Sequence, residues 1–120
     1  MLASASPARL ETLTRAGLRP QVIVSAVDED AFTATKVTEL VAVLAQAKAE
    51  AVAAVLPEDG DVLVVACDSL LDLDGRPLGK PATPEEAIQR WQEMRGRTGH
   101  LHTGHHVIGR LDGQTRSVAA

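Results

Sequence analysis

The chain has 120 residues, of which 45% are hydrophobic and only 2% aromatic, so we expect a core of valine, leucine and alanine. The net charge of −4 argues against non-specific nucleic-acid binding, and the scarcity of aromatic residues argues against base-stacking platforms for single strands. The single cysteine excludes an internal disulfide, and neither a signal peptide nor a membrane-length apolar run is visible, so we expect a soluble cytoplasmic domain.

The first half of the chain predicts two helices separated by a strand. The segment 6–17, SPARLETLTRAG, predicts a helix because Ser6 suits the N-cap and Pro7 suits the first helical position. The β-branched run 21–27, QVIVSAV, predicts a strand that leads into an acidic loop. The apolar run 38–57 predicts the longest helix of the chain.

The second half predicts two strands around a further helix. The apolar runs 61–73 and 100–111 predict strands, and each is followed directly by an Asp-Gly pair that suits a hairpin turn. Between them, the segment 83–96 predicts a helix capped by Thr83. Because strands and helices alternate along the chain, the pattern favours a layered α/β fold.

One lysine lies in the apolar stripe of the long helix. Lys48 follows Leu44 by four residues and precedes Val52 by four, so helical periodicity places all three on one face. One interpretation is a lysine at the edge of the stripe whose ammonium group reaches solvent. The other is a cation directed into a pocket that holds an anion, and the pattern alone leaves both open.

Further polar residues stand where sites are often built. Asp68 follows the apolar run VLVVAC, and the end of a buried strand is a common place for a catalytic or metal-binding carboxylate as well as for a turn. Lys80 is held between a glycine and a proline, which suits either a ligand contact or an exposed turn. Ser4 and Arg9 flank a predicted helix N-terminus, where backbone N–H groups attract anions.

Five segments in order resemble the motifs of the Maf-like nucleoside triphosphate pyrophosphatases: LASASPARLETL, SAVDED, LAQAKAEAV, ACDSLL and LGKP. The later segment GRTGHLHTGHHVI resembles the helix end and strand that follow in that family, so the resemblance covers nearly the whole chain. It implies a Maf-like, ITPase-related α/β architecture with a layered mixed sheet flanked by helices. It also implies hydrolysis of a nucleoside triphosphate to the monophosphate and pyrophosphate with a divalent metal, Mg or Mn.

The resemblance assigns roles to individual residues. Asp68, in the Cys-Asp-Ser motif, is implied to be the general base and, together with Glu29, a metal ligand. The residues implied to bind the substrate phosphates are Ser4, Arg9, Lys48 and Lys80. The family often has two adjacent basic residues after Ser-Pro, whereas this chain has Ala8 and Arg9 there.

Family members normally continue well past this length, so the resemblance implies that residues 1–120 are the N-terminal portion of one Maf-like domain with an incomplete C-terminal lobe. We therefore expect the isolated chain to self-associate and to be weak or inactive as a pyrophosphatase. The expected partner is the nucleoside triphosphate, with a homodimer left open. A nucleic-acid polymer or a membrane is not expected.

Two other classes of function remain open from the sequence. Cys67 with the four downstream histidines could indicate thiol catalysis, or His100 and His102 a metal site, although Cys67 lies in an apolar run and no second ligand pair has zinc spacing. The other alternative is a non-catalytic domain that binds a nucleotide or a protein partner. Pyrophosphate release would separate an enzyme from such a binder.

Overall fold

The computed structural model describes residues 1–120 and contains a four-stranded sheet, three α-helices and one short 3-10 helix. The helices are α1 (Pro7–Arg15), η1 (Glu29–Ala31), α2 (Val37–Val55) and α3 (Pro84–Met94). The strands are β1 (Val62–Leu73), β2 (Arg76–Leu78), β3 (His100–Leu111) and β4 (Gln114–Ala119). Their order is β2-β1-β3-β4, and every neighbouring pair is antiparallel. The predicted combination of a sheet flanked by helices is confirmed.

Two tight turns set the register of the hairpins, as predicted from the Asp-Gly pairs. Asp74 and Gly75 join β1 to β2 with φ values of 53° and 82°, and Asp112 and Gly113 join β3 to β4 with 51° and 75°. Positive φ at both central residues gives the turn whose twist matches that of paired strands, and aspartate and glycine tolerate it best. Each Asp-Gly pair therefore reverses the chain without a longer loop.

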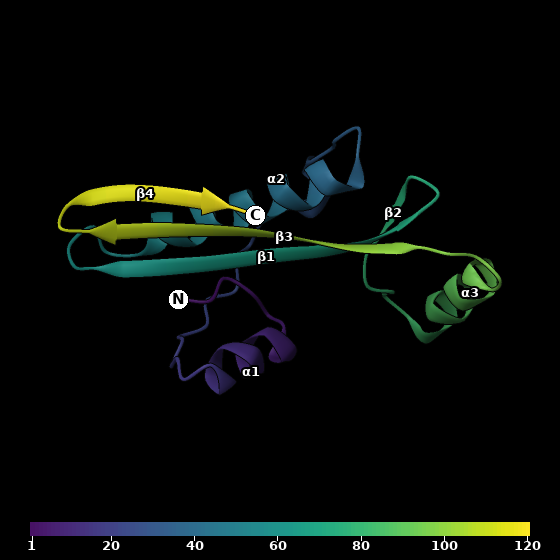
Figure 1. The fold of residues 1–120 in the computed structure, drawn as a ribbon, viewed down its shortest axis with the longest axis horizontal. Coiled ribbons are helices and arrows are strands. Elements are labelled where there is room, and N and C mark those ends of the chain that lie inside the picture. The colour runs from purple at the N-terminus through teal and green to yellow at the C-terminus, as the bar shows by residue number, and fades with distance from the viewer.

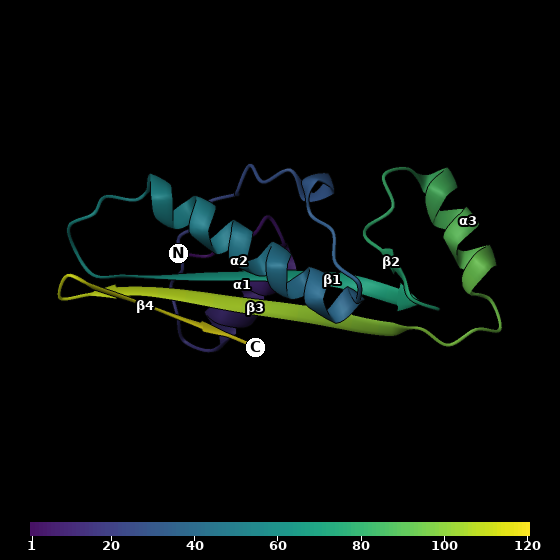
Figure 2. The same cartoon turned by 90° about the horizontal axis from the view of Figure 1, so that it is seen from above.

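Helix α2 covers one face of β1 and β3 (Figure 2). The side chains that it buries are Val37, Val41, Leu44, Ala45, Ala49 and Val52. Gly104 of β3 permits this close packing, because a Cβ there would lie 2.5 Å from the carbonyl oxygen of Val41. Gly104 pairs with Asp68 of β1, so the helix backbone crosses the sheet close to that carboxylate.

The N-terminal segment lies beside β1, with α1 below it in Figure 1. Leu2 forms parallel bridges with Val65 and Val22, which add a short parallel element to the antiparallel sheet. The predicted strand 21–27 is wrong beyond this point, since Val22 is its only bridged residue. The segment around Leu2, with which Val22 pairs, is short because the chain turns at Ser4 toward α1. The remaining β-branched residues of the run therefore have no strand to pair with.

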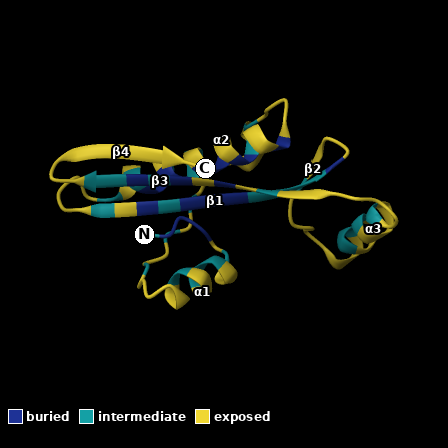
Figure 3. Cartoon of the chain, viewed as in Figure 1, coloured by how far each residue is buried: buried dark blue, intermediate teal, exposed yellow.

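Helix α3 stands apart at one end of the molecule, opposite the β3–β4 turn (Figure 1). It forms as predicted, with Thr83 accepting a hydrogen bond from the Glu86 N–H, but it buries no residue. Figure 3 shows the buried residues gathered along the central strands and α2, whereas α3 is largely exposed. The core thus lies between α2 and the sheet, and α3 is held by other means. None of the helices combines the length and apolar character needed to cross a membrane.

Candidate active site

A cavity of about 600 Å³ lies between the N-terminal loop, the outer half of β1 and the Gly79–Lys80 segment. All six residues singled out from the sequence line it, although they come from five different parts of the chain. These residues are Ser4, Arg9, Glu29, Lys48, Asp68 and Lys80. The structure therefore brings the predicted site residues to one place, while their chemical roles stay predictions.

Asp68 and Lys48 form the buried centre of the cavity. The register of β1 with β3 puts Val64, Ala66 and Asp68 on the face that α2 covers, so the Asp68 carboxylate meets the helix. The Lys48 ammonium donates to Asp68 Oδ1, and it lies 2.7 Å from Glu29 Oε1. The lysine side chain is 14% exposed and that of Asp68 only 8%, and the ammonium is paired with two carboxylates in the cavity and does not extend away from the protein. The edge-of-stripe interpretation of Lys48 is wrong.

Two opposing effects act on the Lys48 ammonium. Burial lowers the pKa of Lys48, but its hydrogen bonds to Asp68 and Glu29 and their negative charges outweigh burial, so the pKa lies above the usual 10.5. The lysine therefore stays charged at neutral pH. Asp68 Oδ2, in contrast, is buried without any hydrogen-bond partner. A buried carboxylate oxygen without a partner is costly, and it can accept a proton or a cation from a ligand.

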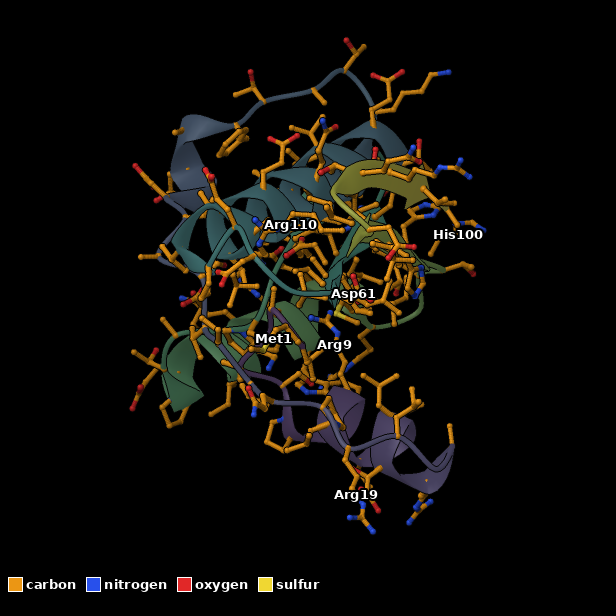
Figure 4. All side chains as sticks on the ribbon, turned by 90° about the vertical axis from the view of Figure 1, so that its left-hand side faces the viewer. Met1, Arg9, Arg19, Asp61, His100 and Arg110 are labelled. Atoms are coloured by element: carbon orange, nitrogen blue, oxygen red, sulfur yellow. The ribbon has the colours of Figure 1, made fainter.

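Arg9 braces the cavity wall instead of standing free. Its Nη1 donates to Ser4 Oγ and to the Cys67 carbonyl, both at 3.0 Å, and its Nη2 donates to Ser69 Oγ at 3.1 Å. Ser69 Oγ lies 2.8 Å from Thr103 Oγ1, which extends the network to β3. Figure 4 shows Arg9 reaching from α1 toward the strands, whereas Arg19 lies at the outer end of the α1 segment. Sequence reasoning placed Ser69 in the Cys-Asp-Ser motif but did not predict its bonds, and it missed Thr103, because only the pairing of β1 with β3 brings the two side chains together.

Ser4 is buried and presents one free hydrogen-bonding group to the cavity. Its Oγ accepts from the Ser6 N–H at 3.2 Å and from Arg9 at 3.0 Å. Both acceptor positions are occupied, and the hydroxyl proton has no acceptor in the protein. The Ser4 hydroxyl can therefore donate a hydrogen bond to an acceptor in the cavity, such as an oxygen atom of a bound anion.

The remaining wall of the cavity is apolar. Leu70 and Leu71 of β1, Leu78 of β2 and Leu101 of β3 line it next to Lys80. These leucines were not singled out from the sequence, where nothing distinguishes them from core residues. One charged wall and one apolar wall suit a ligand with an anionic part and a flat or apolar part.

The alternatives based on cysteine and histidine find no support in the geometry. Cys67 is 7% exposed, and burial raises the pKa of its thiol, which disfavours the nucleophilic thiolate. His100 and His102 stack on each other with ring centroids 6.3 Å apart. No group of three or more His, Cys, Asp or Glu side chains in residues 1–120 could hold a metal ion by itself.

Comparisons with known proteins agree with this geometry. The family model described as Maf-like protein matches residues 1–120. The chain is 56% identical over its full length to a nucleoside triphosphate pyrophosphatase of Streptomyces coelicolor and 59% identical over 88% of its length to that of Streptomyces avermitilis. The aligned regions are 58% and 50% of those relatives, so the chain spans about half the length of the curated relatives it matches. On the match of the family model to every residue, the chain belongs to the Maf-like protein family.

Proposed function

We propose that the protein hydrolyses nucleoside triphosphates to nucleoside monophosphate and pyrophosphate, with the cavity around Asp68 as its active site. The observation that carries this proposal is Asp68 itself: a buried carboxylate with one unpartnered oxygen, in a cavity that also contains three cationic side chains. The names of the relatives from Streptomyces and Mycolicibacterium support the same reaction.

In the proposed reaction a water oxygen attacks the α-phosphorus and the bond to the pyrophosphate leaving group breaks. Asp68 takes the proton of that water, because it is the buried carboxylate among the residues that line the cavity and one of its two oxygens has no hydrogen-bond partner. Lys48 stays protonated and holds Asp68 in place through its hydrogen bond. The positive charge of Lys48 also offsets the negative charge of the phosphates. Ser4 donates its hydroxyl proton to a phosphate oxygen, and Lys80, which lines the same cavity, contacts the same phosphates.

Arg9 has a different proposed part. Because its guanidinium already bonds Ser4, Cys67 and Ser69, it holds the Ser4 hydroxyl in place and contributes positive charge from behind it. The apolar leucines on the other wall would contact the base. This division of the cavity supports a nucleotide in preference to inorganic triphosphate as the substrate.

The donor set fits a divalent cation of the Mg or Mn kind. Hard cations take carboxylate oxygens, and Mg²⁺ is usually held by one or two carboxylates together with substrate phosphates. Asp68 Oδ2 is unpartnered, and Glu29 supplies a second carboxylate. Two carboxylates alone are too few for a protein-only site, which agrees with a cation that is held jointly with the substrate. When bound, such a cation would withdraw charge from the phosphates and activate the attacking water.

The test is pyrophosphate release from nucleoside triphosphates, measured with added Mg²⁺ or Mn²⁺ and compared between the wild type and Asp68→Asn. Loss of a positioned general base lowers the rate by about 10²–10⁴. Asp72→Asn is the matched control, since Asp72 lies on the same strand but does not line the cavity. Normal turnover by Asp68→Asn would refute the proposal. Because the chain spans about half the length of its curated relatives, triphosphate binding without pyrophosphate release establishes the non-catalytic binder only when the chain joined to a Maf-like C-terminal half also releases no pyrophosphate.

A further inference from the structure

The loop that carries Lys80 is short, exposed and far from the core. Gly79, Lys80 and Pro81 lie between β2 and α3, and Lys80 has no ion-pair partner in residues 1–120. A lysine on such a loop would lose much conformational freedom on meeting a ligand, which weakens binding. A device that holds the loop beforehand would therefore raise the affinity of the cavity for an anion.

Two residues of α3 form such a device. Arg90 Nη1 donates to the Gly79 carbonyl, on the N-terminal side of Lys80. Glu86 Oε2 accepts from the Ala82 N–H at 3.0 Å, on the C-terminal side of Lys80. Arg90 Nη2 also donates to Glu86 Oε1, so both carboxylate oxygens and both guanidinium Nη atoms are used. The Arg90–Glu86 pair thus fastens the backbone on either side of Lys80.

The chemistry of the pair suits this task. Residues four apart on a helix face the same way, so Glu86 and Arg90 can bond each other and still reach one loop together. Both bonds to the loop involve a charged partner, which makes them stronger than bonds between neutral groups. The Arg90 side chain is 21% exposed, the least of the three arginines that form ion pairs on α3 or beside it.

Two other ion pairs attach α3 to the rest of the molecule. Arg76 of β2 bonds Glu93, and Arg97 bonds Asp74 of the first hairpin turn, and neither pair touches the loop. The apolar side chains Ile88 and Trp91 of α3 are 58% and 72% exposed, so hydrophobic packing does not set the position of this helix. Removal of Arg90 therefore breaks a bond to the Lys80 loop, whereas removal of Arg76 breaks an ion pair of α3 that leaves the loop bonds in place.

We propose that Arg90 and Glu86 are positioning residues that hold Lys80 at the rim of the cavity for the phosphates of the substrate. The proposal rests on the proposed function, because it gives Lys80 a phosphate to contact. It assigns substrate affinity to two residues that do not line the cavity and would not touch the ligand.

The test is a double-mutant cycle on the full chain, with inorganic triphosphate as the titrated probe in calorimetry. Arg90→Met should weaken binding by roughly three- to tenfold in the wild-type background and leave it unchanged in a Lys80→Ala background, because Arg90 acts on the ligand only through the backbone that carries Lys80. Arg76→Met, which also removes an α3 ion pair, should leave the affinity unchanged. Arg90→Lys should recover part of the loss through a single bond.

Amide hydrogen exchange at Ala82 gives a second readout that needs no ligand. This amide should exchange faster in Arg90→Met and Glu86→Ala than in the wild type or in Arg76→Met. Unchanged exchange, or an equal effect of Arg90→Met with and without Lys80, would overturn the proposal. If the wild type does not bind triphosphate at all, the proposed function fails and the role of Lys80 with it. The exchange at Ala82 would then decide separately whether the loop is held by α3.

Discussion

The substitution Lys48→Met tests the buried ion pair at the centre of the cavity. Methionine keeps an unbranched side chain of similar length that suits the apolar face of α2, but it removes the charge. It would leave Asp68, whose side chain is 8% exposed, with neither carboxylate oxygen bonded. A lysine that merely reached solvent could be replaced at no cost, and the substitution could even stabilise the protein. The structure predicts the opposite sign.

The expected magnitude follows from the burial of each partner. Removal of one member of a buried ion pair typically costs about 3–5 kcal/mol, because the other charge stays buried and unpaired. The contact with Glu29 adds little, since the Glu29 side chain is 56% exposed and exposed pairs contribute about 0–1 kcal/mol. Packing of the methionine side chain on the apolar face of α2 offsets up to about 1 kcal/mol of this loss in stability. We therefore expect Lys48→Met to lower the free energy of unfolding by about 2–5 kcal/mol, a large part of the ~5–15 kcal/mol stability of a typical domain.

The assay is urea unfolding of the wild type, Lys48→Met, Asp68→Asn and the double variant at pH 7. The double variant should be more stable than Lys48→Met, because the uncompensated carboxylate is gone. The pKa of Lys48 is raised in the folded protein, so its contribution is fully present below pH 10.5 and is lost as the pH rises further. The stability difference between wild type and Lys48→Met should narrow only in that alkaline range. Equal stability of Lys48→Met and the wild type at pH 7 would refute this account of the site.

Three further outcomes are expected from the structure. Gly104→Ala should lower the free energy of unfolding by about 1–3 kcal/mol, because the added Cβ would lie 2.5 Å from the Val41 carbonyl oxygen of α2. Gly109→Ala is the control in the same urea denaturation series, since its Cβ would meet only the flexible side chain of Leu63. Cys67 should react with iodoacetamide far more slowly in the native protein than in urea at pH 7, because burial raises the pKa of its thiol and blocks access of the reagent. Mass spectrometry measures the rate of labelling, and fast labelling of the native protein would contradict the packing of β1. Ser4→Ala should weaken triphosphate binding in calorimetry by roughly tenfold, because it removes a buried hydroxyl donor whose acceptor positions are already filled by the Ser6 N–H and Arg9. Ser6→Ala, which removes the α1 cap, should lower the free energy of unfolding by about 1 kcal/mol.

Local features of the sequence were sufficient for most of the secondary structure. The caps at Ser6 and Thr83 and the two Asp-Gly turns depend on side chains and backbone angles within a few residues, so the sequence states them directly. The run 21–27 failed for the complementary reason. Its β-branched residues favour a strand, but a strand needs a partner, and propensity says nothing about where the partner ends.

The residues of the site could also be predicted from the sequence, whereas most of the contacts between them could not. The motifs resembling the Maf-like family, and the charged residues in apolar or constrained positions, identified six residues that the fold brings to one cavity. Only the fold could show that Lys48 bonds Asp68, because the contact depends on the packing of α2 on β1, and Gly104 of a third element allows that packing. Only the fold could show that Arg9 is engaged by Ser69, and that the loop of Lys80 is fastened by Arg90. Such contacts join residues far apart in the chain, and their partners are chosen by strand register and helix packing, which no short window of sequence contains.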